Sequence, residues 1–133
     1  MAMPAHNLVL ILARDFASRL ASAMFLVDPE GTVIYYNEAA ENILGRPFTE
    51  GRAMPASEWS TAFTPVDDQG NPLPLDELPI GRALRERVPA HRDLTITGAD
   101  GIARTIEVTA LPLFAHADEF VGAVAIFWER MEG

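Results

Sequence analysis

Apolar residues near the N-terminus recur at helical spacing. Five of them would share one stripe of a helix wound at 3.6 residues per turn: Leu8, Ile11, Leu12, Phe16 and Leu20. Val9, Leu10 and Ala13 lie off this stripe, so the helix carries more apolar surface than one sheet face can cover. Residues 1–23 are therefore predicted to contain an amphipathic helix that covers a sheet, pairs with a second chain, or does both.

Residues 24–133 are predicted to form one α+β domain. Runs of β-branched and aromatic residues predict five strands, at 24–27, 32–36, 93–97, 102–113 and 119–128. Turn-forming residues separate the first two strands and each successive pair of the last three, which predicts antiparallel hairpins. The simplest packing is a five-stranded antiparallel sheet with helices on one face.

The helices of this domain lie between the second and third strands. Asn37 is placed to cap a short helix over residues 38–44, which Gly45 ends. A proline-rich stretch follows, and a second helix is expected from Leu78 or Pro79 to about Arg87, with Pro79 in its first turn.

The last strand has no polar side. Its alternate residues form two apolar sets, Val121, Ala123, Ala125 and Phe127 on one face and Val124, Ile126 and Trp128 on the other. Something apolar must therefore cover the outside of the sheet, and the N-terminal helix is predicted to flank that outer face in its own chain or in a partner. The predicted homodimer interface comprises residues of the helix and of this strand: Leu8, Leu12, Phe16, Leu20, Val121, Ala123, Ala125 and Phe127.

Composition narrows the function. Hydrophobic residues make up 49% of the 133 residues, enough for a sizeable core, and the net charge of -9 argues against nucleic acid or an anionic membrane as a partner. The chain contains no cysteine and all ten basic residues are arginine, which excludes thiolate, disulfide and Schiff-base lysine chemistry. No apolar run approaches the roughly 20 residues that span a bilayer. A cytoplasmic location is expected.

Candidate chemistry is sparse. The three histidines are not spaced as metal ligands, and no nucleophile–base pair, phosphate loop or dinucleotide motif is found. The acidic pairs Asp67-Asp68 and Asp76-Glu77 are typical of solvated loops. No cofactor, no metal and no enzymatic activity are expected.

Three segments in order resemble the PAS domain family. They are 27–31 with 33–37, Ala39, Ala40, Leu44 and Gly45; then Gly101, Arg104, 106–110, Pro112 and Leu113; and finally 122–128. The resemblance covers residues 16 to 129. It implies the strand order 2-1-5-4-3 and a sensory or interaction module rather than a catalyst.

Such domains hold a small molecule between the helices and the inner sheet face, or use the outer face to dimerise. Counting every second residue gives the expected lining of an apolar ligand site: Ile43, Met54, Trp59, Leu84, Leu94, Ile96, Ile106, Val108, Val124, Ile126 and Trp128. Two functions stay open, a sensor of a small apolar ligand such as a fatty acid, and a dimerisation or protein-interaction module with a filled core. A downstream signalling protein is a further partner that the resemblance allows.

The resemblance also bears on cofactors. Haem-binding members carry an axial histidine on the helix before the third strand, where this chain has none, and His91 just beyond it is the only candidate by position. A strand-edge role is favoured for His91. Members that form a flavin photoadduct or a thioester-linked chromophore need a cysteine that this chain lacks.

Overall fold

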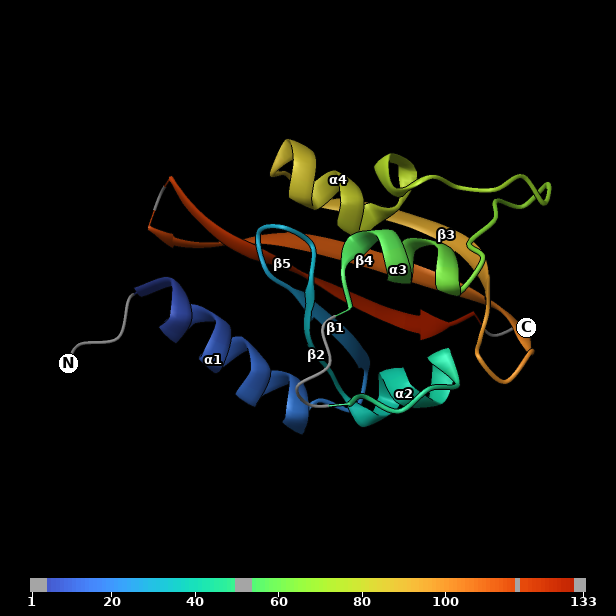
Figure 1. The fold of residues 1–133 in the computed structure, drawn as a ribbon, viewed down its shortest axis with the longest axis horizontal. Coiled ribbons are helices and arrows are strands. Elements are labelled where there is room, and N and C mark those ends of the chain that lie inside the picture. The colour runs from blue at the N-terminus through green and yellow to red at the C-terminus, as the bar shows by residue number, and fades with distance from the viewer. Residues whose placement is uncertain (1–4, 50–53, 117, 131–133) are drawn as a thin grey trace.

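The computed structural model describes residues 5–49, 54–116 and 118–130 (Figure 1). The ends of the predicted ranges 1–23 and 24–133 therefore lie outside the described residues. The elements in chain order are α1 (Ala5–Arg19), β1 (Ala23–Val27), β2 (Val33–Tyr36), α2 (Glu38–Leu44), α3 (Ala56–Ala62), the 3-10 turn η1 (Leu75–Glu77), α4 (Pro79–Glu86), β3 (Ala90–Thr97), β4 (Ala103–His116) and β5 (Glu119–Glu129). No helix in the described ranges is long and apolar enough to cross a membrane.

The strands form one sheet in the order β2-β1-β5-β4-β3, and each neighbouring pair is antiparallel. This confirms the predicted fold class and strand order. The first and last strands in sequence, β1 and β5, lie side by side. The middle segment, which contains α2, α3, η1 and α4, therefore lies between strands that belong to one sheet.

Helices cover both faces of the sheet. On the inner face, α2, α3 and α4 enclose the main core, which includes Phe25, Trp59 and Phe127. On the outer face, α1 packs on a second cluster built from Ala17, Met24 and Leu26, among others. In Figure 1 the strands separate α1 from α3 and α4. The expected position of the N-terminal helix on the outer face is confirmed.

The two faces of β5 are the reverse of those predicted. Ala125 pairs with Ala110 and Phe127 pairs with Val108, and residues directly opposite each other in antiparallel strands share a face. Ala125 and Phe127 therefore belong to the inner core, as does Ala123. Val124 and Ile126 belong to the outer cluster, which α1 covers.

The reason for this error is physical. Alternation shows which residues of a strand share a face, but it does not show which face is inside when both sets are apolar. The β4–β5 pairing also shifts register between Leu113 and Phe114 and again before His116, so counting across the hairpin does not carry the phase from one strand to the next.

The helix α1 is also rotated relative to the prediction. Leu10, Ala13, Ala17 and Leu20 pack against the outer cluster, whereas the predicted stripe faces solvent at Leu8, Ile11, Leu12 and Phe16. Gly122 of β5 leaves room for the Leu10 side chain, since a Cβ added there would lie 3.3 Å from Leu10 Cδ2 and would overlap the carbonyl oxygen of Val27 in β1. The shape of the sheet surface beneath the helix, rather than the size of the apolar side chains, selects the buried face.

A similar close contact positions α4 on the inner side. A Cβ added to Gly81 would overlap the carbonyl oxygen of Leu75 in η1. The adjoining residues Leu78, Pro79 and Ile80 are buried against the core. Glycine at this position therefore lets α4 pack directly on η1.

We predict that Gly81→Ala destabilises the domain, although glycine to alanine inside a helix usually stabilises it by about 1 kcal/mol. The overlap with Leu75 should reverse the sign and lower the free energy of unfolding by at least about 1 kcal/mol in urea denaturation followed by circular dichroism. As a control, Ser57→Ala at an exposed position of α3 should change it by less than about 0.5 kcal/mol. A Gly81→Ala protein as stable as the unmodified chain would contradict the tight contact.

Candidate functional site

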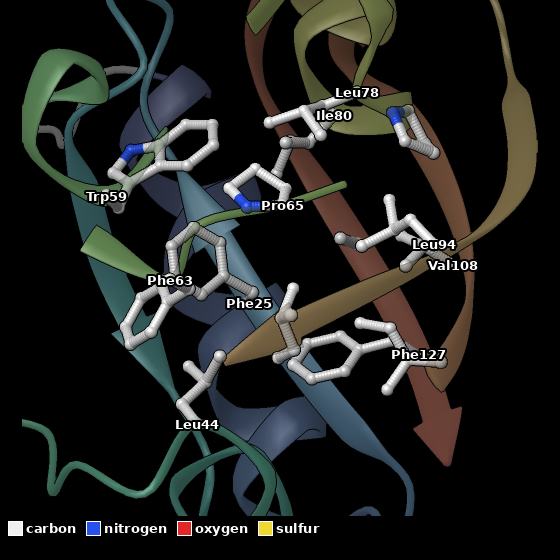
Figure 2. Close-up of a pocket in the computed structure, with 14 residues that line it drawn as sticks. Phe25, Leu44, Trp59, Phe63, Pro65, Leu78, Ile80, Leu94, Val108 and Phe127 are labelled. Carbon is white, nitrogen blue, oxygen red and sulfur yellow. The ribbon is translucent and has the colours of Figure 1, made fainter. Parts of the chain in front are cut away.

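A cavity of about 90 Å³ lies between the inner sheet face and the helices (Figure 2). The sheet contributes Phe25 from β1, Leu94 from β3, Val108 from β4 and Phe127 from β5. Trp59 and other residues of the middle segment face them across the cavity. The other lining residues are Leu44, Phe63, Pro65, Leu78, Pro79, Ile80, Ile96, Ile106 and Ala125. All fourteen residues are apolar or aromatic, apart from the single indole nitrogen of Trp59.

Five of the residues predicted for this site line the cavity: Trp59, Leu94, Ile96, Ile106 and Val108. Three more lie near it without lining it. Ile43 and Leu84 are partly buried against the core, and Met54 is fully buried beside Val33 and Tyr36.

The three predicted residues of β5 lie elsewhere. Val124 and Ile126 face α1 on the outer side, and Trp128 is 42% exposed opposite Glu107. Ala125 and Phe127 take their place in the cavity, although the sequence pattern assigned both to a dimer interface. Phe25, Leu44 and Phe63 were not singled out, because a large apolar residue in a short element gives no signal that distinguishes a cavity wall from filled core.

The only polar side-chain atom among the lining residues is already paired. The indole Nε1 of Trp59 donates to the carbonyl oxygen of Gly31 at 2.7 Å, in the turn between β1 and β2. Gly31 has a φ of 88°, which the tight turn requires and which glycine adopts without strain. The cavity therefore offers no free donor or acceptor, and a polar group placed inside would lose its water without a replacement partner.

Aromatic rings give the cavity a fixed wall. The ring of Phe25 stacks on Tyr36 with centroids 5.7 Å apart, and it meets Trp59 edge to face at 5.4 Å. The hydroxyl of Tyr36 donates to the carbonyl of Pro47 at 3.0 Å. These contacts restrain the rotamers of the rings, so the wall is formed before any ligand is present.

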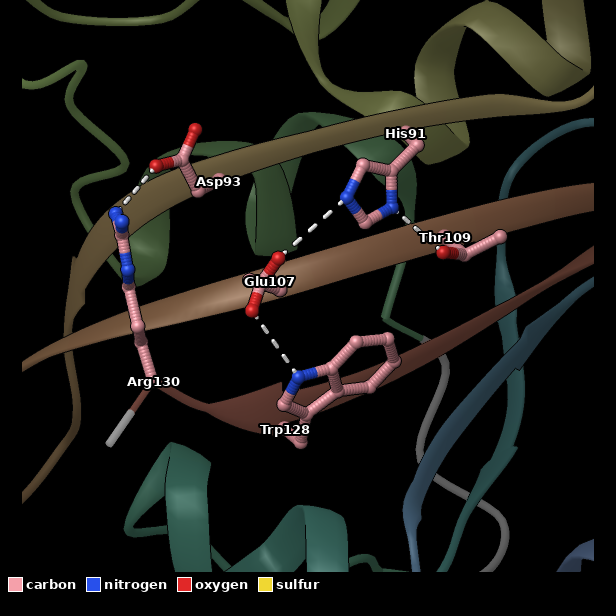
Figure 3. A network of polar contacts seen from close by, with 6 residues as sticks. All are labelled: His91, Asp93, Glu107, Thr109, Trp128 and Arg130. Atoms are coloured by element: carbon pink, nitrogen blue, oxygen red, sulfur yellow. Dashed lines mark hydrogen bonds and ion pairs between the residues drawn. The ribbon is translucent and has the colours of Figure 1, made fainter. Parts of the chain in front are cut away.

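The opposite sheet face carries a polar network (Figure 3). His91 Nδ1 lies 2.7 Å from the Thr109 hydroxyl, and its Nε2 lies 3.7 Å from the Glu107 carboxylate. The indole of Trp128 donates to the same carboxylate at 3.3 Å. Because Thr109 pairs with Ile126 of the outer cluster, the network lies outside the sheet, and His91 is turned away from the cavity. The structure thus removes the one positional candidate for a haem ligand.

Three carboxyl groups with lowered pKa values lie at the surface. Hydrogen bonding to Arg104 lowers the pKa of Asp100. The same guanidinium donates to the carbonyl of Ile43 at 3.0 Å, and this bond joins the β3–β4 hairpin to the end of α2. The pKa values of Asp67 and Glu86 are also lowered, by backbone hydrogen bonds from Asn71 and by Arg82 respectively. None of these groups lines the cavity. In the described part of the chain, no three His, Asp or Glu side chains are grouped to hold a metal ion.

Comparison with solved structures agrees with this architecture. The PAS domain of Bordetella pertussis BvgS superposes with a TM-score of 0.60 at 17% identity, covering 92% of this chain and 86% of that one. The PAS domain of nitrogen regulation protein NR(II) from Vibrio parahaemolyticus gives 0.60 at 16%, covering 90% and 98%. The Rhodobacter sphaeroides LOV protein gives 0.67 at 16%, covering 95% and 68%. At these identities the likeness concerns the fold.

The sequence matches a family model but no individual curated protein. No curated protein matches the chain significantly. The family model described as "PAS fold" matches residues 17–132, which begins inside α1 and includes every strand. The chain therefore belongs to the PAS fold family.

Proposed function

We propose that this PAS domain is a sensory module that binds a small apolar molecule in the cavity and signals as a homodimer. The observation that carries the proposal is the cavity itself, with its apolar walls and its one polar atom already hydrogen-bonded. Its lining contains no acid, base or nucleophile, which favours binding over catalysis.

The size of the cavity narrows the ligand class. About 90 Å³ is less than the roughly 150 Å³ of an apolar cavity that holds a benzene ring. A small uncharged molecule fits the cavity as it stands, and a single aromatic ring requires the aliphatic part of the wall to move outward. A long fatty acid exceeds this volume, and its carboxylate would find no partner among the lining residues.

The structural neighbours support a sensory role. One is described as a PAS domain from a two-component sensor histidine kinase, and another as the PAS domain of a nitrogen regulation protein. The first is a sensor kinase and the second a regulatory protein by description, and this chain shares their fold.

The proposed dimer interface is the exposed apolar stripe of α1. Leu8, Leu12 and Phe16 are 51%, 59% and 56% exposed, and Ile11 lies beside them. Four large apolar side chains within nine residues form a continuous patch that a second copy of α1 would cover. The predicted β5 contribution is withdrawn, because Val121, Ala123, Ala125 and Phe127 are buried in their own chain. Leu20, which packs on the outer cluster, is withdrawn for the same reason.

Ligand binding is tested with toluene and dodecanoate as probes. Trp59 lines the cavity and Trp128 does not, so a Trp128→Phe protein reports the cavity alone by its tryptophan emission. We expect toluene to change the emission with saturation and dodecanoate to leave it unchanged. If neither probe changes it and native mass spectrometry shows no retained molecule, the module with a filled core is the correct function.

Filling the cavity should abolish binding without unfolding the domain. Ala125→Val adds two methyl groups at the cavity wall and places a β-branched residue in a strand, which strands favour. Toluene affinity should fall by at least about tenfold, or about 1.4 kcal/mol. The same change at Ala103, an exposed position of β4, should leave affinity unaltered. Equal affinity of the Ala125→Val and unmodified proteins would place the toluene elsewhere.

Dimerisation is tested by charge on the stripe. Leu12→Glu combined with Phe16→Glu should give a folded monomer, because both side chains are exposed in the single chain and the new carboxylates would repel across the interface. The control, Ser18→Glu with Ala21→Glu, adds the same charge at exposed positions off the stripe and should stay dimeric. Sedimentation that finds the unmodified chain monomeric at about 50 μM would contradict the proposal.

A further inference from the structure

We propose that the side chain of Asn37 holds α1 on the sheet, and that breaking its amide N–H contacts releases α1 as a unit while the rest of the domain stays folded. α1 would then be a detachable arm whose departure uncovers a second apolar surface on the outer face of the sheet. The inference needs neither the ligand nor the dimer proposed above.

Asn37 is unusual in its burial. Among the residues that the structure describes, it is the one buried polar side chain, with 2% of its surface exposed. It follows β2 and precedes α2, and its backbone N–H donates to the carbonyl of Met24 at 3.2 Å. A buried amide must satisfy both its oxygen and its nitrogen, so its partners define what it holds together.

The two ends of this amide serve different parts of the fold. The Oδ1 atom accepts hydrogen bonds from the backbone N–H groups of Ala40 and Met24, each at 3.0 Å, which caps α2 and fixes the start of β1. The Nδ2 atom donates to the carbonyls of Ala17 and Ser22 at 2.9 Å and of Leu20 at 3.3 Å. These carbonyls belong to the last turn of α1 and to its connection with β1.

The donor side is decisive because, among residues 8–19, Ala17 alone is fully buried. Leu10, Ala13 and Leu20 are only partly buried against the outer cluster. The large apolar residues of the α1 stripe face solvent, and the Asp15–Arg19 ion pair lies within the helix itself. The guanidinium of Arg14 lies 4.7 Å from the ring centroid of Tyr35 in β2 and 5.8 Å from that of Phe48, so it also links α1 to the segment that follows α2. A helix of fifteen residues is marginal without tertiary support.

Release of α1 would therefore be local. The cap of α2 and the start of β1 depend on Oδ1, not on Nδ2. The cavity lies on the other face of the sheet and has no lining residue in α1. What α1 would uncover is the outer cluster of Met24, Leu26 and Val124, which is buried in the closed form.

The substitution that separates the two roles is Asn37→Asp. A carboxylate keeps the two acceptor contacts but sets its second oxygen against the carbonyls of Ala17 and Ser22. Asn37→Ser is the second variant, since its hydroxyl can still cap α2 but lacks the amide group that reaches α1. The control is Asn71→Asp, the same chemical change in an exposed loop where the amide donates to Asp67 at 3.3 Å.

The experiment is segment-resolved hydrogen exchange at pH 8 on the full chain. In Asn37→Asp and Asn37→Ser, amides of residues 8–19 should exchange at least about tenfold faster than in the unmodified protein, equivalent to about 1.4 kcal/mol of lost protection. Amides of α2 and of β3 to β5 should keep their protection, and the Asn71→Asp control should match the unmodified chain throughout. An apolar dye should bind more strongly to both Asn37 variants.

Two results would overturn the proposal. One is unchanged protection of residues 8–19 in both variants, which would show that apolar contacts alone retain α1. The other is a loss of protection that is equal in α1, α2 and the strands, measured in whichever of the two Asn37 variants is the more stable. That result would show that Asn37 supports the whole domain rather than the attachment of its first helix.

Discussion

The structure depends on the burial of β5 from both sides. This strand lies at the centre of the sheet, and residues 121–125 are all buried. An antiparallel sheet can leave one face to water, but a central strand with apolar side chains on both faces cannot. In the structure two layers therefore cover this strand: the helices of the middle segment on one side, and α1 on the other. The outer cluster and the position of α1 both follow from this arrangement.

The two layers divide the chemistry of the domain. Inside, aromatic rings and aliphatic side chains enclose a small space whose only side-chain nitrogen donates to the carbonyl of Gly31. Outside, α1 covers part of the sheet, and a polar network around Glu107 occupies another part of the same face. The cavity is thus confined to the inner face, whereas the outer face combines α1 and its exposed apolar stripe with groups that tolerate water. This division suits a domain in which an internal event is reported at an outer surface.

Much of the fold could be predicted from the sequence, because local signals determine it. The cap at Asn37 and the stop at Gly45 delimit α2 at residues 38–44, as the structure has it. Turn residues identify the hairpins, and the strand order follows from the family resemblance. The outer position of α1 needed no tertiary information beyond the apolar character of β5, whereas the sequence pattern did not locate α3 and η1 within the proline-rich stretch.

The candidate site was predicted only in part, because the face of the sheet to which a side chain points depends on tertiary structure. Ala125 and Val124 are both small, apolar and buried, and only the pairing with β4 shows that the first lines the cavity and the second meets α1. In α1, large side chains such as Phe16 suggested the buried face, but the structure packs the side with Leu10, Ala13 and Ala17 against the sheet. The donor contacts of Asn37 to α1 span up to 20 residues and leave no pattern in the sequence beyond a helix cap.

The most direct test of this account is to determine which residues of β5 point to each face of the sheet, by nuclear Overhauser contacts in the isotopically labelled protein. The account predicts contacts between the ring of Phe127 and the methyl groups of Leu94 or Val108, and between the methyl groups of Val124 and Ala17. Contacts of Phe127 with Ala17, or of Val124 with Leu94, would reverse the strand and contradict both the cavity and the position of α1.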